Sequence, residues 1–159
     1  MTNKILPVTL KHRSYGIILF HRFPRSIKYL ILKHKKGHWA FPKGHGNGDE
    51  SKMETALREL YEETKIKDIR FITDKIMLKE KYIYYNRRNQ KIDKIVEYFV
   101  AESGTTDVKI CKKEILNYKW LTLNSAEKII TFEQSKQILK EADKIVTKTI
   151  FKTLNKNGI

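Results

Sequence analysis

The sequence predicts an α/β fold, in which one mixed β-sheet is enclosed between α-helices. Three observations predict it. Apolar runs of strand length lie on both sides of one amphipathic helical segment, a second helical pattern closes the chain, and 40% of the residues are hydrophobic. The order strands, helix, strands, helix is typical of helices packed on a sheet. A chain of 159 residues supports one hydrophobic core, so we expect a single domain over residues 1–159.

The first third of the chain has strand and turn signals. We expect strands at 15–20 and 28–32, a turn at 23–26, a short extended piece at 39–41 that ends at Pro42, and a loop at 43–49 containing three glycines. A helix follows, because Ser51 and Glu54 have the spacing of a capping box. Its buried stripe is predicted from apolar residues at helical spacing, Met53, Ala56, Leu57 and Leu60.

The remaining elements follow from the same signals. We expect strands at 69–72, 76–83, 92–101 and 118–121, with a turn at 86–90 between the middle two. Asn124 or Ser125 is a candidate cap for a short helix, and residues 131–134 resemble a second capping box. A long C-terminal helix over about 132–154 is predicted from its apolar series, Ile138, Leu139, Ala142, Ile145, Val146, Ile150 and Leu154.

Charge and cysteine content restrict the function. The formal net charge is +15, which indicates either a solvated basic surface or an anionic partner such as a polyphosphate or a nucleic acid. The single cysteine, Cys111, excludes a disulfide within the chain and fits a reducing cytoplasm. The strongest apolar run, residues 15–20, is too short to cross a bilayer. We therefore expect a cytoplasmic protein with no membrane association and no obligate protein partner.

Carboxylates are concentrated in one part of this basic chain, at Glu50, Glu59, Glu62 and Glu63. A solvated helix face with ion pairs from Arg58 to Glu54 or Glu62 is the ordinary explanation of such a run. The alternative is a divalent cation that relieves the repulsion among the carboxylates. Mg²⁺ binds a few carboxylates together with substrate phosphate oxygens, and a spare carboxylate can accept the proton of a bound water. Mn²⁺ is the alternative ion.

The spacing of these residues resembles the box of the Nudix hydrolase superfamily. The matching residues are Gly44, Glu50, Arg58, Glu59, Leu60, Glu62, Glu63 and Ile66. The resemblance implies the Nudix fold and hydrolysis of a nucleoside diphosphate linked to another group. One position departs from the pattern, because Lys65 stands where the family has glycine. If that residue keeps a left-handed backbone, lysine costs roughly 1 kcal/mol more than glycine.

The segments around the box resemble the asymmetric diadenosine tetraphosphate hydrolases of this superfamily. The resemblance lies in residues 37–45, 94–102, Glu114, 120–121 and 131–132. It implies a bis(5′-nucleosyl)-tetraphosphatase that uses Mg²⁺ to cleave diadenosine tetraphosphate into ATP and AMP. Two alternatives stay open: a Nudix pyrophosphohydrolase acting on RNA 5′ ends, and a non-catalytic module that binds a nucleotide or RNA.

The resemblance also implies roles for individual residues. It makes Glu59, Glu62 and Glu63 metal ligands and catalytic residues together with Arg58, and it adds Glu114 and the Gly44 carbonyl as metal ligands, with Glu50 in support. It places Lys43, Lys94 and His38 against the polyphosphate, Tyr82 or Tyr84 against adenine, and Phe132 on the opposite wall. The ordinary readings are a surface position for Glu114, packing beside Trp39 for His38, and core positions for the aromatic residues.

Overall fold

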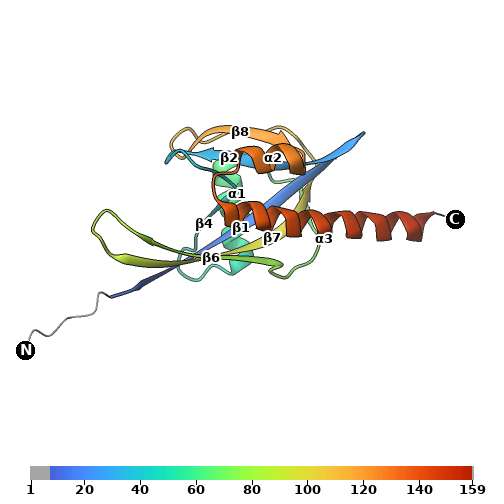
Figure 1. The fold of residues 1–159 in the computed structure, drawn as a ribbon. Helices are drawn as coiled ribbons and strands as arrows, with labels where there is room; N and C mark the ends of the chain where they lie inside the picture. Colours follow the sequence, from blue (N-terminus) through green and yellow to red (C-terminus); the bar gives the residue numbers. More distant parts are fainter. Residues whose placement is uncertain (1–7, 159) are drawn as a thin grey trace, which may run out of the picture.

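The computed structural model describes residues 8–158 and forms an eight-stranded mixed sheet with three helices (Figure 1). The strands are β1 (Leu10–Phe23), β2 (Ser26–His34), β3 (Trp39–Ala40), β4 (Lys43–His45), β5 (Ile69–Phe71), β6 (Leu78–Tyr85), β7 (Lys91–Ser103) and β8 (Ile115–Leu121). The helices are α1 (Lys52–Thr64), α2 (Leu123–Ile129) and α3 (Glu133–Asn157). This confirms the predicted α/β class. The assignment of all of residues 1–159 to one domain stays a prediction.

Two long parallel strands form the centre of the sheet. Strand β1 pairs with β7 from Leu10↔Ile92 to Phe20↔Glu102. The other edge of β1 is divided, since β4 pairs with residues 14–16 and β2 with residues 20–23. All pairings other than β1 with β7 are antiparallel. The division lets β4 pair with β1 beside β2 and contact α1, which brings the box into position.

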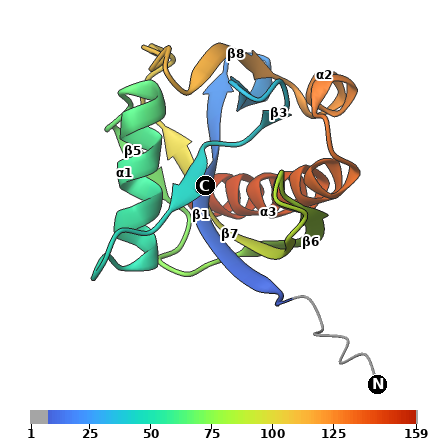
Figure 2. The same cartoon turned by 90° about the vertical axis from the view of Figure 1, so that its left-hand side faces the viewer.

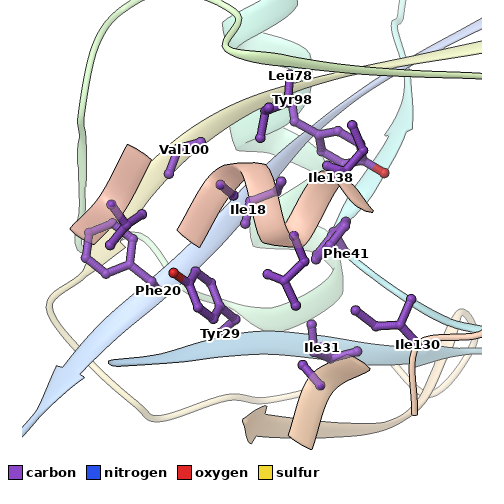
Figure 3. Close-up of a cluster of buried hydrophobic side chains, with 14 of the residues drawn as sticks. Ile18, Phe20, Tyr29, Ile31, Phe41, Leu78, Tyr98, Val100, Ile130 and Ile138 are labelled. Carbon is purple, nitrogen blue, oxygen red and sulfur yellow. The ribbon is translucent and has the colours of Figure 1, made fainter. Parts of the chain in front are cut away.

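Hydrophobic residues on the two faces of the sheet form two cores. On one face α2 and α3 pack over Ile18, Tyr29, Ile31, Tyr98 and Val100 (Figure 3). On the other face α1 packs over the alternate residues of the same strands, Ile17, Leu19, Leu30, Leu32, Phe99 and Ala101. Because successive strand residues point to opposite faces, one continuous apolar run supplies both cores. Figure 2 shows the helices on either side of the sheet, as predicted.

Helix α1 begins as predicted, but its buried face differs. Ser51 and Glu54 form a full capping box, in which Glu54 N–H donates to Ser51 Oγ over 3.1 Å and Ser51 N–H donates to Glu54. The prediction that Leu57 belongs to the buried stripe is wrong, because this residue is 37% exposed. Glu63 is buried instead. The pair Glu54–Arg58 does not form; Arg58 contacts other carboxylates.

The remaining boundaries correct several predictions. Thr122, rather than Asn124 or Ser125, caps α2 and accepts from the Ser125 N–H. The second capping box is absent, since α3 starts after Phe132 without a side-chain cap. Thr131 Oγ1 accepts from the Trp39 N–H instead, at 2.8 Å. Residues 43–45 of the expected loop form β4. Among the helices of residues 8–158, none combines the length and hydropathy that a bilayer crossing requires.

Candidate active site

Strand β4 connects the two halves of the candidate site. Its side chains alternate, so Lys43 and His45 line a cleft, whereas Gly44 faces α1. A Cβ atom at Gly44 would overlap the carboxylate of Glu59. Glycine at this position therefore lets the backbone of β4 lie directly against that carboxylate.

Three carboxylates converge beside Gly44. Ligand oxygens of Glu59, Glu63 and Glu114 lie within 4.8 Å of one another. Glu59 and Glu63 lie on α1 one turn apart, as the spacing of four predicts. Glu62, expected beside them, lies at the solvent edge with its side chain 47% exposed and is outside this group. We call Glu59, Glu63 and Glu114 the acidic cluster.

Glu114 reaches the acidic cluster from a loop that is tied to the end of α1. The backbone N–H of Cys111 donates to the carbonyl of Glu63 over 3.2 Å, and that of Lys109 donates to Thr64 over 2.9 Å. The N–H of Glu114 then donates to the Cys111 carbonyl. These bonds satisfy carbonyl groups at the end of the helix and hold the loop against it. They explain how a residue 51 positions after Glu63 joins the same cluster.

Arg58 links the cluster to the glycine-containing loop. Its guanidinium donates two hydrogen bonds to Glu50, at 2.7 and 3.0 Å, and one each to Glu59 at 3.0 Å and Glu62 at 3.2 Å. It also donates to the carbonyl of His45 over 2.7 Å. These hydrogen bonds raise the pKa of Arg58 and lower that of Glu50. Arg58 therefore orients the carboxylates of the box.

The electrostatics of the acidic cluster fit a divalent cation. Glu63 is 3% exposed, and its Oε2 is buried without a hydrogen-bond partner among the described residues. Burial, followed by the charges of Glu59 and Glu114, raises the pKa of Glu63 to about 9, although Lys43 opposes this shift. Burial raises the pKa of Glu59 as well. A cation bound among these oxygens would remove both the repulsion and the unsatisfied acceptor.

A cleft of about 890 Å³ opens on the other side of β4. The cleft is lined by all six residues that were predicted to bind substrate: His38, Lys43, Tyr82, Tyr84, Lys94 and Phe132. They come from β4, β6, β7, the turn before β3 and the start of α3. The volume falls within the range typical of ligand pockets.

The basic groups of the cleft are partly desolvated. Burial lowers the pKa of Lys43, while Glu80 and Glu63 act in the opposite direction. Burial and the charge of Lys43 lower the pKa of Lys94 to about 8. The Lys94 ammonium lies 3.4 Å from His45 Nε2, and His45 Nδ1 lies 3.0 Å from the Arg13 carbonyl oxygen. The carbonyl accepts from Nδ1–H, so Nε2 carries the lone pair that faces Lys94.

Aromatic rings line the outer part of the cleft. The Tyr82 and Tyr84 rings lie 6.1 Å apart on the same face of β6, as their spacing predicts. Phe132 is 51% exposed and lies 5.6 Å from the His38 ring. His38 stacks on His34 at 4.7 Å, and burial lowers the pKa of His38 to about 4. His38 is therefore a neutral ring at pH 7.

Glu80 is a cleft residue that the sequence patterns did not indicate as part of the site. Its carboxylate is buried and accepts from Tyr98 OH at 3.0 Å and from Ser135 Oγ at 2.6 Å. These bonds connect β6 to β7 and to the first turn of α3. The only sequence signal is its place between Leu78 and Tyr82, which all share one face of β6.

Lys65, the departure from the box, ends α1 in a left-handed conformation with φ 61° and ψ 15°. Its N–H donates to the Tyr61 carbonyl over 2.9 Å. The ammonium groups of Lys65 and Lys67 lie 4.8 and 4.6 Å from the centre of the Tyr61 ring. These cation–π contacts partly offset the strain of a non-glycine residue. The helix end is thus kept without glycine.

An α/β sandwich that sets an acidic helix beside a basic, aromatic cleft defines a candidate metal-assisted hydrolase of phosphate anhydrides. The chain belongs to the Nudix family, because the model of the NUDIX domain matches residues 6–142. This confirms the expected membership and the assignment as a Nudix hydrolase.

Three known proteins illustrate what this chain is similar to. The chain is 35% identical over 146 residues to a rat bis(5′-nucleosyl)-tetraphosphatase (asymmetrical), covering 86% of this chain and 97% of the relative. The crystal structure of a Caenorhabditis elegans Ap4A hydrolase binary complex matches with a TM-score of 0.73 at 25% identity, covering 86% and 98%. Subunit 2 of an Arabidopsis thaliana mRNA-decapping enzyme is 32% identical over 109 residues, covering 69% of this chain and 27% of the relative.

Proposed function

We propose that this Nudix hydrolase cleaves diadenosine tetraphosphate asymmetrically, into ATP and AMP, with Mg²⁺ as its ion. The observation that carries the proposal is the two-sided arrangement about β4. Gly44 lies against the acidic cluster, while the neighbouring Lys43 and His45 line the cleft. A phosphate chain in the cleft would then pass within one residue of the carboxylates. The similarity to asymmetric tetraphosphatases favours a dinucleotide as the ligand.

Glu59, Glu63 and Glu114 are the residues that would hold the ion, with the Gly44 carbonyl as a further oxygen ligand. Bound Mg²⁺ supplies charge neutralisation at the phosphoryl oxygens and acidifies a water. Glu62 remains a proposed catalytic carboxylate, held at the edge of the cluster by Arg58. In this scheme Arg58 and Glu50 orient the carboxylates and are not proton acceptors.

The cleft residues would bind two parts of the substrate, the charged polyphosphate and the flat adenine ring. Lys43 and Lys94 are ammonium donors for the polyphosphate, whose charge would counter the burial that lowers their pKa values. His38, neutral at pH 7, would donate or accept a hydrogen bond rather than supply charge. Tyr82 or Tyr84 and Phe132 offer faces for adenine stacking.

The test is to incubate purified protein with Mg²⁺ and diadenosine tetraphosphate and to separate the products. We expect equal amounts of ATP and AMP, and loss of turnover in EDTA. A product of two ADP, or no turnover, would refute the asymmetric assignment. Glu59→Gln should reduce kcat about 10²-fold or more, while the unfolding temperature stays close to that of the wild type.

RNA 5′ ends are the second candidate substrate. The net charge of +15 and the similarity to an mRNA-decapping subunit favour it. Triphosphorylated RNA and diadenosine tetraphosphate at equal concentration would compete for one site. Preferential hydrolysis of the RNA would replace the first proposal. The non-catalytic alternative is disfavoured because the box carboxylates are intact and two of them, Glu59 and Glu63, converge with Glu114.

A further inference from the structure

The β6–β7 hairpin and the first part of β1 form a three-stranded ribbon that reaches past the helices (Figure 1). Its two faces differ in kind. Strand alternation directs the side chains of Glu80, Tyr82 and Tyr84 to the cleft and those of Lys81, Ile83 and Tyr85 to the opposite face, and Ile83 also borders the cleft. That opposite face is not used by the proposed hydrolysis.

The strand register shows which residues share the opposite face. Arg13 pairs with Ile95, which pairs with Lys81. One row further out, Lys11 pairs with Asp93, which pairs with Ile83, and the last row joins Lys91 to Tyr85. We call this surface the open face and define it by Lys11, Arg13, Lys81, Ile83, Tyr85, Lys91, Asp93 and Ile95.

The N-terminal end of helix α1 lies beside the inner boundary of the open face. Lys52, at the start of α1, forms an ion pair with Glu97 at 2.9 Å and lies 5.8 Å from the centre of the Tyr15 ring. Tyr15 and Glu97 pair with each other in the row next to Arg13 and Ile95. Beyond this row the apolar side chains are left in solvent, since Ile83 is 59% and Tyr85 is 63% exposed.

The open face is strongly basic. It carries four cationic side chains and one anionic one, Asp93, and none of the four cations forms an ion pair within the described residues 8–158. Arg87 and Arg88 add two more positive charges at the hairpin tip. Residues on one face repeat roughly every 6.7 Å along a strand and strands lie about 4.8 Å apart, so Lys91 lies beside the exposed Tyr85 and the other cations follow along the same face.

We propose that the open face binds single-stranded nucleic acid, with phosphates on its lysines and arginine and an unstacked base on Tyr85. A flat sheet that presents an exposed aromatic ring among cations is suited to this ligand, because stacking requires bases that are not paired. A membrane surface fits less well, since the hairpin tip is polar and charged over residues 86–90. An acidic peptide would leave the tyrosine face unexplained.

The experiment measures fluorescence anisotropy of labelled single-stranded RNA and DNA of about 12 nucleotides, a length within the range of single-strand binding sites, in EDTA so that hydrolysis cannot contribute. The test variants are Arg13→Glu/Lys81→Glu and Tyr85→Ala. The matched controls are Lys148→Glu/Lys152→Glu on α3, which changes the net charge equally, and Tyr61→Ala, another partly exposed tyrosine. Thermal unfolding checks that every variant folds.

The proposal expects the double variant on the open face to lower the slope of log K against log salt by about 1.4, because two phosphate contacts are lost. It expects Tyr85→Ala to weaken binding by about 10-fold, and both controls to bind within about 2-fold of the wild type. Hydrolysis of diadenosine tetraphosphate should be unchanged in all of them, which separates this proposal from the proposed function. Equal loss in the two double variants, tighter binding of duplex than of single strands, binding only to phosphatidylserine vesicles, or no binding would each overturn it.

Discussion

Replacing Gly44 with alanine should inactivate the enzyme while leaving it folded. The added Cβ would overlap the carboxyl group of Glu59, which is only 13% exposed and is held by Arg58 at 3.0 Å. Ordinary van der Waals separation requires the carboxylate to retreat by more than about 1 Å. A displacement of that size at a reacting centre costs about 10²-fold in rate, which corresponds to about 2.7 kcal/mol.

The effect on stability should be smaller than the effect on rate. Overpacking in a core costs about 1–3 kcal/mol, and we expect the lower end here because Glu59 borders the solvent. The assay compares kcat for diadenosine tetraphosphate with the free energy of unfolding in urea. Gly44→Ala should lose most of its kcat at nearly unchanged m-value.

Gly46→Ala, two residues further along the chain and just after β4, is the matched control. A Cβ at Gly46 would lie 3.3 Å from Thr55 Oγ1, a contact that a small movement relieves. We expect its kcat to stay close to that of the wild type. Wild-type kcat in Gly44→Ala would refute the reasoning, because the position of the Glu59 carboxylate would then not matter for the reaction.

Three further predictions concern the edges of the site. Lys65→Gly should raise the free energy of unfolding in urea by about 1 kcal/mol, because glycine removes the left-handed strain at φ 61°. Unchanged or lower stability would show that the contacts of Lys65 with Tyr61 compensate fully for this strain. Phe132→Ala should raise KM about 10-fold with little change in kcat, and the opposite pattern would remove this ring from substrate binding. The charged form of Lys94 predominates below its pKa of about 8 and is lost as the pH rises, so KM should increase above about pH 8. The variant Lys94→Arg stays charged and should show a flatter KM over the same alkaline range. Identical pH profiles of the two proteins would contradict the assignment of Lys94 to the polyphosphate.

Patterns that depend on local spacing were predictable. The apolar run at 15–20 and the capping box at Ser51 indicate β1 and α1 correctly, because side-chain direction and helix capping follow from the local backbone alone. The Nudix box identifies the family for the same reason, since its spacing encodes one helix face and one loop. The C-terminal helix lies within a few residues of its predicted bounds, at Glu133–Asn157.

Features that depend on distant contacts were not predictable. Thr131 has the residue type of a cap, but its hydroxyl bonds to the Trp39 N–H. Leu57 has helical spacing with the stripe, yet it is 37% exposed. Glu80 lies in the cleft, although strand alternation with Leu78 and Tyr82 was its only sequence signal.

By itself, the sequence determined the family, the α/β class and which residue types are available for metal and phosphate. Only the tertiary structure decided which of them meet: Glu114 joins Glu59 and Glu63, whereas Glu62 stays at the edge. The physical reason is that helix spacing orients side chains only within one element. The split edge of β1, which places β4 between the acidic cluster and the cleft, depends on pairings among strands far apart in the chain.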